Sequence, residues 1–174
     1  MAGLVPRADG KIKMEVLGVY KVGTGQETAD VVFLVDETKQ LVLPIYIDEP
    51  IALMIQLGIE RVQPHRPMTH DLIMSMLEAT EFEPEYISID GMIKQVYTAT
   101  LHLRSLRDGH RLRIDSRPSD AIAVAVRADC EILADESLKE QMVPRKSLKL
   151  PDSASDPGQD FGPDDQRIDS PYGV

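Results

Sequence analysis

The chain has 174 residues, a length typical of one domain with room for a terminal extension. Its hydrophobic fraction of 43% indicates a soluble globular protein, and its net charge of −10 disfavours a general nucleic-acid coat protein or a binder of anionic membranes. The single cysteine excludes an intramolecular disulfide and a cysteine-rich zinc site, and no apolar run is long enough to cross a membrane, so we expect a cytoplasmic protein.

The first third of the chain predicts three strands and a helix. Apolar residues alternate from Ile12 to Val22, as in a strand with one buried face. Segments 30–36 and 41–47 predict two further strands, joined as a hairpin by the polar turn 37–40. The first strand is expected to bury Ile12, Met14, Val16, Tyr20 and Val22.

A helix follows from Pro50 to Gly58, and its apolar side chains surround the helix axis. Such a helix is buried in a core or at a subunit interface, so we expect a homo-oligomer with this helix or a sheet edge near its interface. A second helix is expected to begin at Thr69, with the threonine hydroxyl as cap. Its predicted apolar stripe consists of Leu72, Ile73, Met76 and Leu77.

The rest of the chain predicts more strands than helices. Strands are expected at 85–89, 96–103, 111–115 and 131–134, with an Asp-Gly turn at 107–110. Ser119 is expected to cap a helix over 120–128, and a last helix covers about 135–142. This order lacks βαβ alternation, so we expect a single α+β domain with a mainly antiparallel, mixed sheet and three to four short helices.

The domain is expected to cover residues 11–145, after a flexible N-terminus over 1–10 and before an acidic tail over 146–174. Residues 151–174 hold six aspartates, one arginine, four prolines and three glycines, a composition typical of disorder. The tail could simply keep the protein solvated, or it could compete with a polyanion for a basic site.

Five arginines lie within residues 104–117, offset by two aspartates. Guanidinium groups bind phosphate with two parallel hydrogen bonds, so this cluster is a candidate phosphate site that includes Arg113. A solvated strand face explains the same residues.

Two segments share one pattern, an arginine and a proline, then a hydroxyl residue and an acid in the first turn of a helix. They are 66–71 (RPMTHD) and 115–120 (DSRPSD). A helix N-terminus beside a guanidinium forms an anion site, which makes Arg66 and Arg117 candidate phosphate contacts. The candidate catalytic residues are His70, Asp71, Asp115 and Asp120.

Asp71, Asp115 and Asp120 would form a site for a divalent cation, Mg²⁺ or Mn²⁺, if the fold brought them together. Phosphodiester hydrolysis needs a cation or base to activate water and positive charge to stabilise the developing oxyanion. The structural alternative is that the hydroxyl residues and acids are ordinary helix caps, each worth about 1 kcal/mol.

The same residues resemble the bifunctional nuclease family, a bacterial and plant domain. The matching stretches are 43–47 (LPIYI), 66–72 (RPMTHDL) and 115–123 (DSRPSDAIA), and the resemblance spans about residues 11–145. It implies hydrolysis of DNA and RNA by the candidate residues above. One position departs from the family pattern, because Ile51 stands where the family has an acid after the first stretch.

Three functions remain open from the sequence. The first is a metal-assisted nuclease acting on DNA and RNA without sequence preference. The second is a non-catalytic, oligomeric binding or regulatory module with anion-binding helix caps, which the negative net charge and Ile51 favour. The third is hydrolysis of a small phosphorylated metabolite, which needs no long basic track.

Overall fold

The computed structural model describes residues 10–24 and 27–148. Its strands are β1 (Lys11–Thr24), β2 (Glu27–Asp36), β3 (Leu41–Ile47), β4 (Phe82–Ile93), β5 (Val96–Ser105), β6 (Arg111–Ser116), β7 (Glu131–Asp135) and β8 (Val143–Pro144). Its α-helices are α1 (Glu49–Ile59), α2 (Thr69–Ala79) and α3 (Pro118–Ala128), and two 3₁₀ helices are η1 (Glu136–Gln141) and η2 (Arg145–Ser147).

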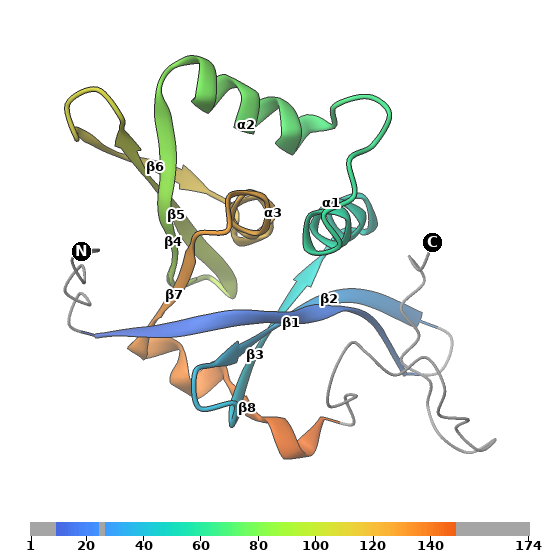
Figure 1. The fold of residues 1–174 in the computed structure, drawn as a ribbon. Helices are drawn as coiled ribbons and strands as arrows, with labels where there is room; N and C mark the ends of the chain where they lie inside the picture. Colours follow the sequence, from blue (N-terminus) through green and yellow to red (C-terminus); the bar gives the residue numbers. More distant parts are fainter. Residues whose placement is uncertain (1–9, 25–26, 149–174) are drawn as a thin grey trace.

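The described strands form one eight-stranded sheet in the order β6-β5-β4-β7-β1-β2-β3-β8. Neighbouring strands are antiparallel except β4 and β7, which pair in parallel after the chain crosses over through α3. In Figure 1, β1–β3 run below α1 and α3 while β4–β6 run beside α3, so the sheet curves around this helix. The expected α+β class with a mixed, mainly antiparallel sheet is confirmed.

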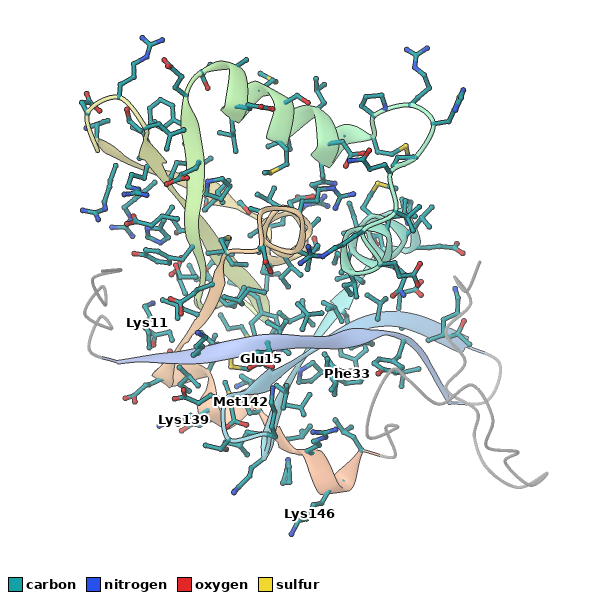
Figure 2. All side chains as sticks on the ribbon, in the orientation of Figure 1. Lys11, Glu15, Phe33, Lys139, Met142 and Lys146 are labelled. Atoms are coloured by element: carbon teal, nitrogen blue, oxygen red, sulfur yellow. The ribbon has the colours of Figure 1, made fainter. Side chains whose placement is uncertain are left out.

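The sequence prediction for β1 is wrong in its second half. A β-bulge between Val16 and Gly18 shifts the register against β2, and the inserted residue exchanges the two faces of the strand. Met14 therefore packs into the main core, whereas Tyr20 packs on the opposite face with its ring centroid 5.5 Å from that of Phe33. Figure 2 shows Phe33 on the lower side of β1, away from α1 and α3.

Helix α1 buries one face within this chain, while Glu49, Pro50 and Ile59 at its ends are exposed. Its residues Ala52 and Ile55 are fully buried in the main core, and the helix packs against α3. The approach is close at Gly58, where an added Cβ would lie 2.4 Å from Cγ2 of Val126 on α3. No helix among the described residues is long and apolar enough to span a membrane.

The predicted caps of α2 and α3 are wrong by one and two residues. Met68 and Arg117 occupy the N-cap positions, while Thr69 and Ser119 lie inside the first turns. In α2, Asp71 supplies the capping bond, because its Oδ2 accepts the backbone N–H of Met68 at 2.8 Å. In α3, proline at the first helical position starts the helix, since its fixed φ is already helical.

Two other helix predictions need correction. In α2, Ile73 and Leu77 pack against the core, but Leu72 and Met76 of the predicted stripe are 55% and 60% exposed. The last predicted helix is the 3₁₀ helix η1, a tighter turn than the expected α-helix. The predicted acidic segment 151–174 lies outside the described residues, as do residues 1–9 of the predicted N-terminus.

Candidate functional site

The two arginine-proline segments of the sequence meet in space at the N-terminal ends of α2 and α3. Nε2 of His70, in the first turn of α2, lies 3.2 Å from Oδ1 of Asp120, in the first turn of α3. His70 is 3% exposed, and burial lowers its pKa below the ordinary value, although Asp120 acts in the opposite direction. Neutral His70 with its hydrogen on Nε2 satisfies this bond, because an ionised carboxylate only accepts.

The other ring nitrogen of His70 has no hydrogen-bond partner among the described residues. Nδ1 is buried, and with the hydrogen on Nε2 it carries an unused lone pair. Burying such an acceptor costs free energy, so the His70–Asp120 contact is maintained against a local penalty.

Arg117 donates two hydrogen bonds to the carboxylate of Asp120. Its Nε donates to Oδ2 at 2.6 Å and its Nη2 donates to Oδ1 at 3.1 Å, which is a two-pronged carboxylate contact. Burial acts to raise the pKa of Asp120, but the bonds from Arg117 and His70 outweigh it and hold that pKa below its ordinary value. The Arg117 side chain is 62% exposed, so the group beside Asp120 faces solvent.

Asp71 belongs to a second ion pair beside the first. Its Oδ1 accepts from Nε of Arg127 at 2.7 Å. Nη1 of Arg127 also donates to the carbonyls of Met54 and Ala123, each at 2.9 Å, so this largely buried guanidinium links α1, α2 and α3. Burial acts to raise the pKa of Asp71, but the bonds from Arg127 and from the Met68 N–H outweigh it and hold that pKa below its ordinary value.

Asp115 and Arg113 lie on a different face of the molecule. The β5–β6 register pairs Leu101 with Ile114, His102 with Arg113 and Thr100 with Asp115. Leu101 belongs to the main core, so Arg113 and Asp115, which alternate with Ile114, stand on the opposite face of the sheet from α3. The fold thus unites His70, Asp71 and Asp120 in one region and places Asp115 outside it.

The three predicted metal-binding aspartates do not form one ligand cluster in the part of the chain that the structure describes. No group of three or more histidine, cysteine, aspartate or glutamate residues suited to a metal occurs there. Asp71 and Asp120 each contact an arginine instead. A Mg²⁺ or Mn²⁺ site stays a prediction.

Most of the arginine cluster at 104–117 is neutralised by carboxylates. Arg104 pairs with Glu83, Arg107 pairs with Glu81, and Nη2 of Arg111 donates to Glu85 at 2.8 Å. Arg117 contacts Asp120, as described above. This pairing favours the solvated strand face over a phosphate site for the cluster as a whole, while Arg113 and the other candidate, Arg66, are exposed.

Sequence reasoning missed Arg127 as part of the site. The available signal was a single arginine in the last turn of a helix made of small apolar residues. Its partners come from three different helices, which spacing along the chain does not reveal.

The comparison with known families matches the region that contains this site. The family model of the bifunctional nuclease domain matches residues 32–145, more than half of the chain, including both arginine-proline segments. The chain belongs to the bifunctional nuclease domain family. The predicted resemblance is confirmed.

Individual relatives of this bifunctional nuclease domain are distant. Bifunctional nuclease 2 of Oryza sativa subsp. japonica is 28% identical over 109 residues, which are 62% of this chain and 34% of the relative. An uncharacterised protein of Mycobacterium tuberculosis (strain H37Rv) is 29% identical over 114 residues, 66% of this chain and 64% of the relative. Bifunctional nuclease 2 of Arabidopsis thaliana is 27% identical over 109 residues, 62% of this chain and 33% of the relative. The chain thus spans about a third of the plant relatives' length.

Proposed function

We propose that this domain is a phosphodiester hydrolase that acts on DNA and RNA where α2 and α3 begin. The observation that carries the proposal is the contact of 3.2 Å between buried His70 and Asp120, with exposed Arg117 beside it. These residues come from the two segments that carry the family resemblance. The names of the plant relatives support the same chemistry.

The proposed roles follow from burial and charge. Asp120 accepts the proton of the attacking water, because its lowered pKa keeps it ionised at neutral pH. Arg117 binds a phosphoryl oxygen and stabilises the negative charge that develops there. His70 is a positioning residue, since its Nε2 faces Asp120 and its Nδ1 is sealed from solvent.

The proposal also includes three finer features. A divalent cation, Mg²⁺ or Mn²⁺, is the proposed cofactor, and Asp71 and Asp120 would hold it only by giving up their contacts with Arg127 and Arg117. A cytoplasmic location agrees with the single, half-buried cysteine. A homo-oligomer agrees with the apolar side chains that α2 leaves exposed.

The decisive experiment is a cleavage assay on purified protein freed of contaminating nuclease. Single- and double-stranded DNA and RNA are each tested with Mg²⁺, with Mn²⁺ and with a chelator. We expect Asp120→Asn to lower turnover by roughly 10²–10⁴-fold, the usual contribution of a general base. Arg117→Lys keeps the charge but loses the planar fork, so it should lower turnover as well.

Asp129→Asn is the matched control, because Asp129 is an exposed acid at the other end of α3. It sits at φ 55, a left-handed conformation that asparagine also adopts, so the variant should fold and cleave like the wild type. A folded wild type that cleaves none of the substrates under any condition would overturn the proposal.

The alternative is a non-catalytic module that binds anions at these helix starts. It is favoured by one observation, that both Asp71 and Asp120 are already paired with arginines. It predicts a wild type without nuclease activity whose thermal stability rises with inorganic phosphate, and a loss of that rise in Arg117→Lys.

A further inference from the structure

A groove of about 420 Å³ has Arg117 in its lining, and His70 does not line it. Its volume falls within the range of about 300–1,000 Å³ typical of small-molecule sites. Segments far apart in sequence form it, namely the end of β3, the start of β5 and the start of α3. Its aromatic and polar lining consists of Tyr46, Asp48, Gln95, Tyr97, Arg117 and Ser119.

Two tyrosines give this groove an aromatic surface. The side chain of Tyr46 is 68% exposed, a high fraction for a large aromatic residue, so most of its ring faces solvent. Tyr97 is half-buried beneath the groove, and its pKa is raised by burial and by the proximity of Tyr46. The two side chains are therefore neighbours, with the ring of Tyr46 open to an incoming molecule.

Arg117 supplies oriented positive charge at the groove. Asp120 occupies its Nε and one hydrogen of Nη2, so the guanidinium keeps three N–H donors for another ligand. Because Asp120 holds the group in one orientation, little conformational entropy is lost when a phosphate binds. Lys94 does not line the groove, although it directly precedes Gln95 in the tight turn between β4 and β5, where both residues have positive φ.

We propose that this groove binds one nucleotide of a single-stranded nucleic acid, with its base stacked on Tyr46 and its phosphate on Arg117. The proposal rests on the proposed nuclease function and specifies its substrate class. An exposed aromatic ring beside a cation is how proteins hold unpaired bases, whereas the bases of a duplex are stacked on one another and offer no free face.

The polar groups of the groove suit the edge of a base better than a second phosphate. Asp48 would repel another anion, but its carboxylate accepts hydrogen bonds from amino or imino groups of a base. Gln95 offers both a donor and an acceptor. Arg117 also contacts Asp120, so a nucleotide in this groove would place its phosphate beside the proposed catalytic carboxylate.

Fluorescence anisotropy with labelled oligonucleotides tests the proposal in a chelator-containing buffer at low salt. The probes are a short oligothymidylate, an oligomer of equal length that lacks bases, and a duplex of the same length. We expect the oligothymidylate to bind the full chain at least roughly tenfold more tightly than the other two probes, because only it presents free base faces. Equal affinity for all three probes, or no binding of the oligothymidylate, would overturn the proposal that this groove binds a nucleotide.

Variants separate stacking from other effects. Tyr46→Ala should weaken oligothymidylate binding by roughly fivefold to 150-fold, the usual contribution of one stacked base, while Tyr46→Phe should bind like the wild type. Leu106→Ala removes a comparably exposed apolar side chain directly after β5, at the strand end away from the groove, and should leave binding unchanged. An unchanged affinity in Tyr46→Ala, or a change only in oligomeric state, would contradict the proposal.

The same measurements distinguish this proposal from the nuclease proposal. If the wild type binds the oligothymidylate through Tyr46 but never cleaves nucleic acid, the nucleotide-binding groove is supported and the nuclease proposal is overturned. If the wild type and Tyr46→Ala cleave single strands at equal rates, the nuclease proposal is supported and the nucleotide-binding groove is overturned.

Discussion

At the scale of single residues, His70 connects the stability of this domain to the chemistry proposed for it. Its ring fills a buried position between α2 and α3, where one nitrogen contacts Asp120 and the other has no partner among the described residues. Protonation would place a hydrogen on that buried Nδ1 and a positive charge near Arg127. The folded chain therefore favours neutral histidine, which also keeps Asp120 oriented toward Arg117.

This arrangement predicts a specific pH dependence. Burial lowers the pKa of His70 below its ordinary 6.5, so the unfolded chain binds a proton before the folded chain does. The stabilising contribution is complete above pH 6.5 and is lost as the pH falls through the lower, folded value. In His70→Gln, the free energy of unfolding should fall less steeply with acidification, as urea titrations between pH 7 and the acid limit would measure.

His65→Gln is the control for this prediction, because His65 is exposed in the loop before α2. Its free energy of unfolding should follow the wild-type slope. His102, whose pKa burial also lowers, remains in every variant and contributes the same slope to each. Parallel curves for wild type and His70→Gln would show that His70 does not favour its neutral form in the folded chain.

At the scale of helices and strands, the contact between α1 and α3 includes Arg127, the residue that binds Asp71 of the site. Gly58 of α1 faces α3, and a Cβ there would lie 2.4 Å from Cγ2 of Val126 and 3.0 Å from Nη1 of Arg127. Val126 is β-branched and cannot turn away easily, and Arg127 is the residue that holds Asp71. The absence of a side chain at Gly58 thus allows the helices to approach.

Gly58→Ala should therefore destabilise the domain by about 1–3 kcal/mol through overpacking, less any helix-propensity gain of about 1 kcal/mol. Val126→Ala removes the obstructing methyl groups, so the double variant should lose less stability than the two single losses added together. A double-mutant cycle from urea denaturation measures this coupling. Additive losses would mean that the helices shift apart without cost.

Local patterns predicted the strands well because strand periodicity and turn chemistry are local properties. The strand over 41–47 and the turn before it are found as predicted. The helix predictions are wrong where burial depends on an element distant in sequence. The periodic pattern predicts that Leu72 is buried, but its side chain is 55% exposed. The bulge in β1 turns Tyr20 to the other face, and its one local signal is Gly18, a glycine inside a strand pattern, which often marks a bulge.

The site was predictable in its residues but not in its partnerships. The shared pattern points to both segments, yet the contact between His70 and Asp120 joins residues 50 positions apart, which no local pattern reveals. Glu83 and Glu85 lie on β4, and the registers of β4 with β5 and of β5 with β6 bring them to Arg104 and Arg111. Glu81, the partner of Arg107, directly precedes β4. Asp115 was grouped with Asp120 by proximity in sequence, but strand alternation places its side chain on the other face.

At the scale of the whole molecule, exposed large apolar side chains occur along β4–β6, as at Ile93 and Ile114, and also on and beside α2. The sheet face around β4–β6 is covered by ion pairs such as Arg111 with Glu85, which disfavour association through that face. Helix α2 and its N-cap residue present Met68, Leu72 and Met76 at a spacing of four residues, so these side chains form one stripe along the helix. Exposed stripes of this kind mark interfaces between protein chains.

The stripe on α2 predicts that the protein forms a homo-oligomer through this helix. Light scattering should give a mass above the 19.4 kDa of one chain, and the double substitution Leu72→Gln with Met76→Gln should reduce it to the monomer mass. Glutamine forms helices nearly as well as leucine and methionine, so α2 should persist in the variant. Ile93→Gln, at an equally exposed apolar position on β4, should leave the mass unchanged. A wild-type mass of one chain at micromolar concentration would contradict the prediction, whereas an oligomer that survives the double substitution would place the interface elsewhere.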